Sequence, residues 1–114
     1  MKGYKKWLPF LTLLYSIQGG ACETLCKELT FDALATIDYG QTHSILHSNG
    51  RWVEYNPLIQ RGKEGQYFAA IMLLHGAITY SLPKPWRSRW QNTSIIVEGF
   101  VVGRNAYLGI GVRF

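Results

Sequence analysis

Three stretches of the chain are rich in apolar residues, and turn-forming residues separate them. In the first stretch, from about Leu29 to Leu46, Leu34, Ile37 and Ile45 recur at the spacing of one face of a helix. The sequence Ser48-Asn49-Gly50 that follows is typical of a turn. The pattern therefore predicts a helix from about residue 29 to residue 46.

The second stretch, Tyr67 to Leu82, is the most apolar and contains no charged residue. As a helix it would be about 24 Å long, somewhat shorter than the ~30 Å hydrocarbon core of a bilayer. Apolar side chains occur all around this predicted helix, so we expect it to be buried on every side. Pro83 and Pro85 follow it and are expected to end it.

The third stretch, Asn92 to Phe114, is ambiguous. Its first part, Ser94 to Val102, is short and rich in β-branched residues, which favours a strand and a buried helix about equally. Its last part, Leu108 to Phe114, alternates apolar residues with Gly and Arg, and Gly103-Arg104-Asn105 suits a hairpin turn. The expected fold class is mainly α, with two to three short membrane-associated helices and the option of a C-terminal β-hairpin.

The chain begins like an export signal. A basic segment, residues 1–7, precedes ten mostly apolar residues, 8–17, which are too few to span a bilayer, and then the small residues 19–21. We therefore expect residues 1–21 to be a signal peptide or an N-terminal anchor, and residues 22–114 to be one small helical envelope domain. The net charge is +5, but three of the 12 Lys and Arg residues lie at positions 2, 5 and 6, so we expect no nucleic-acid partner.

Two cysteines, Cys22 and Cys26, follow this leader directly. Cys22 comes after small residues, as a lipidated cysteine does, and is a candidate lipidation site. Four residues apart in a regular helix, two Cβ atoms stand about 5–6 Å apart, which is too far for a disulfide. A disulfide would require a turn here, and we expect two ordinary thiols instead.

Several polar residues interrupt the apolar stretches. Asp38, Gln41 and Thr42 share one face of the first predicted helix, while His75 and Glu98 are isolated in the second and third stretches. In apolar surroundings such groups need partners. Two arrangements are open: one intramembrane cluster that binds protons or joins the helices, or separate groups that each have local partners or face water.

A basic and aromatic block follows the second stretch. It consists of Lys84, Trp86, Arg87, Arg89 and Trp90, with no acidic residue from position 83 to position 92. Amphipathic aromatics beside cations are typical of a membrane interface on the cytoplasmic side. The block predicts such an interfacial belt, with an ordinary surface loop as the alternative.

The sequence offers little for metal binding or catalysis. His43 and His47 are spaced as two ligands on one helical turn, but no third ligand is distinct, and Glu54 and His75 would have to come from elsewhere. No nucleophile, phosphate-binding or dinucleotide motif is present. We expect no enzyme activity, no metal and no cofactor.

A set of short motifs resembles a group of small bacterial and phage-encoded membrane proteins of uncharacterised function. The motifs are Asp38-x-x-Gln41-Thr42, Glu54-x-Asn56-Pro57-Leu58, the alanine-rich second stretch, Trp86-Arg87 through Glu98, and Gly103-x-Asn105. The resemblance covers about residues 29–114. It implies a compact helical membrane protein and no known activity, and this chain differs from the pattern by its additional leader.

Together these features predict a small non-enzymatic protein of the bacterial envelope, with the inner membrane favoured over the outer membrane or periplasm. It would act as a structural or interaction component, phage-encoded in one variant of the hypothesis, and contact membrane lipid and a protein partner or a second copy. One alternative is a lipoprotein binding module tethered through Cys22. The other is an accessory of an ion, proton or solute pathway that uses Asp38, His75 and Glu98.

Overall fold

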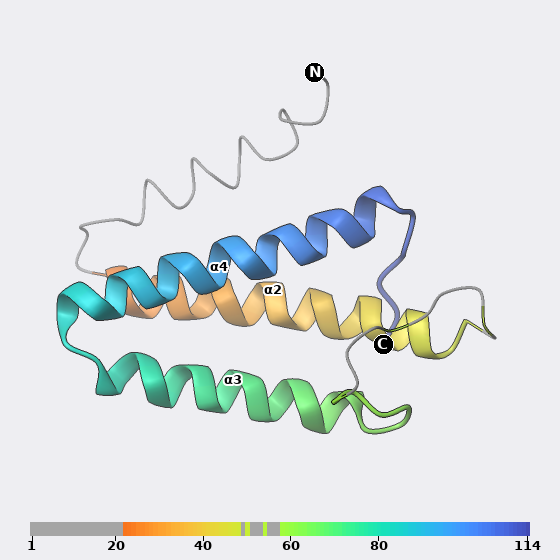
Figure 1. Cartoon of the computed structure of the whole chain (residues 1–114), viewed down its shortest axis with the longest axis horizontal. Helices are drawn as coiled ribbons and strands as arrows, with labels where there is room; N and C mark the ends of the chain where they lie inside the picture. Colours follow the sequence, from red (N-terminus) through yellow and green to blue (C-terminus); the bar gives the residue numbers. More distant parts are fainter. Residues whose placement is uncertain (1–21, 49, 51–53, 55–57) are drawn as a thin grey trace, which may run out of the picture.

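The computed structural model describes residues 22–48, 50, 54 and 58–114, and these form three α-helices. The helices are α2 (Glu23–Leu46), α3 (Glu64–Ser81) and α4 (Lys84–Tyr107). α3 runs antiparallel to α2, and α4 reverses direction again, so α2 and α4 lie side by side and point the same way (Figure 1). The predicted leader, residues 1–21, lies outside the described residues.

Local sequence explains where the helices begin and end. α2 and α3 cover the two helices predicted from the apolar pattern, and each begins a few residues earlier than predicted. Leu82 is extended, as expected of a residue before proline, and Pro83 precedes α4. Pro85 lies in the first turn of α4, where the N–H it lacks has no partner within the helix.

The C-terminal region contradicts the predicted fold class, because no β-hairpin is present among the described residues. The residues from Ser94 to Val102 and the supposed hairpin turn Gly103-Arg104-Asn105 all belong to α4. Gln91, Ile95 and Gly99 recur every four residues and are buried, while the β-branched residues between them face outward. Helical spacing of the buried positions therefore outweighs the strand propensity.

The last seven residues, 108–114, have no regular structure and fold back onto α2 (Figure 1). Gly109 has a φ of +86°, which favours glycine and turns the chain at the end of α4. The backbone N–H of Arg113 donates to the carbonyl of Gly40 at 3.0 Å. A Cβ atom at Gly40 would overlap Val112 and lie 2.9 Å from Phe114. The absence of a side chain at Gly40 therefore allows the C-terminal residues to pack against α2. The alternating residues thus contact a helix instead of a second strand.

The helices also differ from the membrane-associated elements expected from sequence. In the described part of the chain, no helix combines the length and apolar character needed to cross a membrane. α3 is not buried on every side, because Leu73 is 77% and Leu74 is 58% exposed. Its buried residues are instead Glu64, Phe68, His75 and Thr79.

The expectation of two ordinary thiols is wrong, because Cys22 and Cys26 form a disulfide with their Cα atoms 5.4 Å apart. In a regular helix through both residues, the two Cβ atoms would be too far apart for this bond. Cys22 instead precedes α2, with φ −91° and ψ 7°. The turn that a disulfide requires is therefore provided by the start of the helix. The sulfur of Cys22 is bonded to that of Cys26, so it cannot at the same time carry a lipid thioether.

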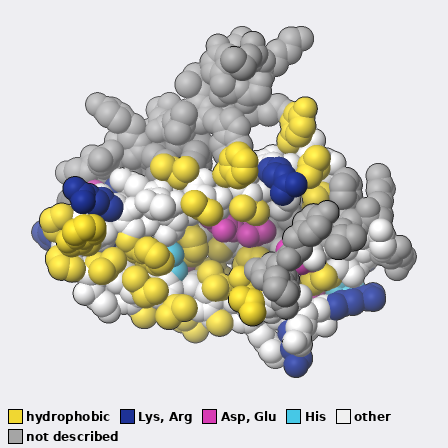
Figure 2. Space-filling view, in the orientation of Figure 1, with side chains coloured by type: hydrophobic (Ala, Val, Ile, Leu, Met, Phe, Trp, Pro, Cys, Tyr) yellow, Lys and Arg dark blue, Asp and Glu magenta, His cyan; other side chains and the backbone are white. Residues whose placement is uncertain are grey.

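The apolar core is small. Phe31, Ala35 and Ile95 form its buried centre, where α2 meets α4, and the partly buried Leu34, Ile71 and Met72 pack around them. Of the described residues, six buried ones are hydrophobic and eight are polar or charged. Within the described ranges, sixteen large hydrophobic residues are exposed, and hydrophobic side chains cover much of the face in Figure 2. Compared with most folded proteins, polarity is therefore partly inverted: many polar side chains are buried and many large hydrophobic side chains are exposed.

The core centre gives a first testable prediction. We expect Ile95→Ala to lower the free energy of unfolding by about 2–5 kcal/mol, because Ile95 is fully buried and truncation leaves a cavity. Ile96→Ala is the matched control, because Ile96 is 53% exposed and its truncation should change stability by less than about 1 kcal/mol. Urea unfolding followed by circular dichroism measures both. Equal losses would contradict the assigned helix face.

Candidate functional site: polar groups buried between the helices

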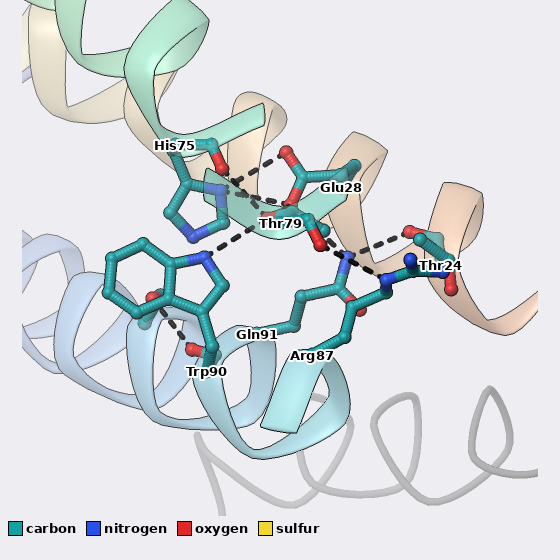
Figure 3. A network of polar contacts seen from close by, with 8 residues as sticks. Thr24, Glu28, His75, Thr79, Arg87, Trp90 and Gln91 are labelled. Carbon is teal, nitrogen blue, oxygen red and sulfur yellow. Dashed lines mark hydrogen bonds and ion pairs between the residues drawn. The ribbon is translucent and has the colours of Figure 1, made fainter. Parts of the chain in front are cut away.

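The carboxylate of Glu28, on α2, is the centre of a buried network that joins all three helices (Figure 3). From α3, Thr79 Oγ1 lies 2.6 Å and His75 Nδ1 lies 2.9 Å from Glu28 Oε1. From α4, Gln91 Nε2 donates to the same oxygen at 3.1 Å and to the carbonyl of Thr24 at 2.8 Å. Hydrogen bonds to a buried carboxylate offset the cost of removing its charge from water.

Aromatic rings enclose the histidine of this network. The His75 ring stacks on Phe31 with centroids 3.7 Å apart, and on Trp90 with centroids 4.9 Å apart. Trp90 Nε1 also donates to Thr79 Oγ1 at 3.0 Å. His75 Nε2 is buried and has no hydrogen-bond partner in the described part of the chain. The ring is therefore fixed by stacking and by its contact with Glu28.

This network divides the predicted interfacial belt. Trp90 and Arg87 turn toward α3, and Arg87 Nε donates to the carbonyl of Thr79 at 3.0 Å. Lys84, Trp86 and Arg89 remain exposed, with the Arg89 guanidinium 5.2 Å from the centre of the Trp86 ring. The block begins a helix instead of forming a loop. Only its three exposed members could lie at an interface.

A second polar group joins α2 to α4 further along. Burial, a hydrogen bond with Asp38 and repulsion by its charge raise the pKa of Glu98 to about 9. At neutral pH Glu98 therefore carries a proton that it can donate to Asp38. Thr42 Oγ1 also donates to Asp38, at 3.4 Å. One turn later, Gln41 donates to the carbonyl of Val102 at 3.0 Å.

The residues predicted as one polar cluster thus lie in separate hydrogen-bonded groups. Asp38, Thr42 and Glu98 are together, and Gln41 accepts a further hydrogen bond from Asn105 at 3.1 Å. His75 belongs to the network around Glu28 instead. Among the described residues, the cluster is therefore formed in part.

Burial also perturbs a carboxyl between these two groups. The pKa of Asp32 is raised, first by burial and then by the nearby charge of Glu28, and His75 opposes the shift. Asp32 Oδ1 is buried and makes no hydrogen bond within the described ranges. Carboxyl groups therefore follow one another along the inner side of α2.

The third polar group lies at the other end of α3. His43 Nδ1 and His47 Nε2, on the last turns of α2, lie 2.8 Å and 3.3 Å from Glu64 Oε1. Burial would raise the pKa of Glu64, but hydrogen bonds with backbone groups at the start of α3 and with both rings outweigh it and lower that pKa. The histidine pair singled out from sequence therefore has a third neighbour, although neither Glu54 nor His75 provides it.

Sequence reasoning missed several of these residues. Lys27 is fully buried, where it contacts Glu23 at 2.9 Å and Ser88 at 3.0 Å. Glu28, Glu64, Thr79 and Gln91 were also not singled out. Glu28 and Gln91 flank the apolar stretches, where a charged or amide group predicts a solvent-exposed helix end. The positions that the three helices bring together cannot be read from the periodicity of each one separately.

Comparison with known proteins adds no identification. The chain matches no protein-family model, no curated protein and no solved structure. The resemblance to small bacterial and phage-encoded membrane proteins therefore stays a prediction.

The Glu28 network gives a second prediction. We expect Thr79→Val to lower the free energy of unfolding by about 1–3 kcal/mol, because it removes a donor to Glu28 and an acceptor for Trp90 without changing side-chain shape. In the control, Thr36→Val, the lost hydroxyl is exposed and donates only to a carbonyl of its own helix, so the change should stay within about 0.5 kcal/mol. Urea unfolding measures both variants. An unchanged free energy of unfolding in Thr79→Val would contradict the stabilising role of the network.

The Glu98 carboxyl gives a third prediction. Its pKa is raised to about 9 from 4.5, so between these pH values the folded chain binds a proton that the unfolded chain has lost. Stability should therefore fall as the pH rises through this window, by at most about 1 kcal/mol per pH unit, since partial exposure weakens the effect. Glu98→Gln cannot ionise, so its advantage over the wild type should grow from pH 5 to pH 9. A constant difference in urea unfolding would contradict the assignment.

Proposed function

We propose that this chain is a small non-enzymatic interaction component of the bacterial envelope, which binds a protein partner through the outer faces of α3 and α4. The observation that carries the proposal is the partial inversion of polarity: polar groups hold the helices together, and large hydrophobic side chains remain outside. Contiguous exposed apolar surface is typical of sites that bind other molecules.

The outer face of α3 is apolar along most of its length. Ala69, Ala70, Leu73, Ala77 and Tyr80 are exposed and recur at intervals of one, three or four residues. This spacing places them on one side of the helix. The opposite side contains His75 and Thr79, which bind Glu28. α3 is therefore amphipathic in the reverse sense, since its polar side is buried and its apolar side is exposed.

The outer face of α4 has the same character. Ile96, Val97, Phe100 and Val101 are exposed, with Phe100 at 63%, and Tyr107 continues the row at 78%. Figure 2 shows hydrophobic side chains distributed over the face that α4 and α3 present. Transfer of such side chains from water to an apolar contact is favourable by about 25 cal/mol per Å². A partner that covers the exposed apolar residues of both α3 and α4 would gain affinity from this transfer.

A second candidate, binding to an anionic lipid surface, is favoured by one specific observation. Lys84, Trp86 and Arg89 are exposed together at the start of α4. Amphipathic aromatics and cations of this kind are enriched at lipid headgroups.

The two remaining hypotheses, a lipid-tethered binding module and an accessory of an ion or solute pathway, have less support. The Cys22 sulfur is in a disulfide, which opposes a lipid tether, and the pathway residues Asp38, His75 and Glu98 belong to two groups.

Photocrosslinking in intact cells tests the proposal and gives a fourth prediction. We would place the photoreactive residue benzoylphenylalanine at Leu73 or Phe100, and at Gln60 as an exposed polar control. We expect discrete protein adducts from positions 73 and 100 and none from position 60, because only the apolar faces would be covered. An adduct of twice the chain mass would identify a second copy. Lipid adducts alone would favour the second candidate, and no adduct would contradict both.

A further inference from the structure

We propose that His43, His47 and Glu64 form a binding site for a divalent transition-metal ion of the zinc type. The three side chains converge from two helices, although 17 or more residues separate Glu64 from either histidine in the sequence. Each offers one ligand atom, and these atoms all lie within 4.8 Å of one another. This inference does not depend on the partner-binding function proposed above.

The distances suit a common centre. Zinc binds histidine nitrogen and carboxylate oxygen at about 2.0–2.2 Å, so neighbouring ligand atoms of a tetrahedral ion stand about 3.3 Å apart. His47 Nε2 is 3.3 Å from Glu64 Oε1, and His43 Nδ1 is 2.8 Å from it. An ion would require His43 and Glu64 to separate by about half an ångström. It would also require the ligand nitrogens of the two histidines, which lie within 4.8 Å of each other, to stand about 3.3 Å apart, and side-chain rotations can provide both changes.

The helices position the ligands. His43 and His47 are one turn apart, at the end of α2, and their ring centroids are 4.2 Å from each other. Glu64 is the first residue of α3, and the reversal of the chain between the two helices brings its carboxyl group to both rings. Both histidine side chains are partly exposed, at 23% and 30%, which leaves a route for an ion and for a water ligand.

An independent observation points to a missing ligand at Glu64. Its side chain is 95% buried, since only 5% remains exposed. Yet Oε2 makes no hydrogen bond to any part of the chain that the structure describes. A buried carboxyl group with an unpaired oxygen is costly. A cation held between this carboxylate and the two rings would remove that cost, whereas hydrogen bonds from the rings alone reach only Oε1.

The donor set determines the class of ion. Two imidazoles and one carboxylate suit zinc and neighbouring divalent ions of the first transition row, and are poorly suited to magnesium or calcium, which prefer all-oxygen ligands. Three protein ligands leave a fourth position of a tetrahedral zinc ion to water. The disulfide keeps Cys22 and Cys26 out of the ligand set, so they do not compete for the ion.

Calorimetric titration of the full chain with zinc chloride, without reductant so that the disulfide stays intact, tests the site. We expect one ion per chain. His43→Gln, His47→Gln and Glu64→Gln should each weaken binding by more than about 100-fold, because loss of a second-shell contact alone costs about 10–100-fold. Glu98→Gln is the matched control for removing a carboxylate, and its affinity should equal that of the wild type.

Two further measurements keep a folding defect apart from a loss of ligand. Circular dichroism should show the same helix content in all variants, and zinc should raise the thermal midpoint of the wild type and Glu98→Gln but not of the ligand variants. Cobalt should give visible absorption bands that each ligand variant lacks. Absence of zinc binding by the folded wild type would overturn the proposal. So would equal binding by Glu64→Gln, because the ion would then lie elsewhere.

Discussion

The buried carboxylate of Glu28 is the constraint on which the three-helix arrangement depends. It accepts hydrogen bonds from Thr79 and Gln91 and contacts His75, so one side chain of α2 fixes the position of both other helices. A carboxylate removed from water needs such partners, and each of them has a specific direction. The apolar core that surrounds Phe31 is too small to determine this arrangement alone, because apolar packing has little directional preference.

This polar interior changes the role of the surface. In most small domains, the large hydrophobic side chains are mainly in the core, and charged and polar side chains are mainly at the surface. Here α3 and α4 keep Leu73 and Phe100 outside while Thr79 and Gln91 lie inside. The hydrogen-bonded interior specifies one alignment of the helices, and the apolar exterior remains available for association. Stability and association are thereby assigned to different faces of the same helices.

The sequence predicted most of α2 and α3, because the apolar residues of α2 recur at helical spacing and those of α3 form one long uncharged stretch. For α4 it left a strand and a helix equally open, because β-branched residues suit both, and the C-terminal hairpin that it allowed was wrong. The buried positions Gln91, Ile95 and Gly99 follow helical spacing. The polar sites could be predicted only in part. His43 and His47 are near each other in sequence and were found, whereas Glu64 approaches them only because α3 reverses the chain. Tertiary proximity of this kind leaves no periodic signal within one segment.

The parallel alignment of α2 and α4 has a consequence for how the chain folds. The hydrogen bonds between these helices join residues 60 to 67 positions apart, such as Glu98 with Asp38 and Gln91 with Thr24. Contacts between helices adjacent in sequence close shorter loops. Here the most extensive contacts are those between α2 and α4, and they can form only after α3 has brought the chain back to the start of α2. The high contact order that results should make folding slower than is usual for a helical domain of this size.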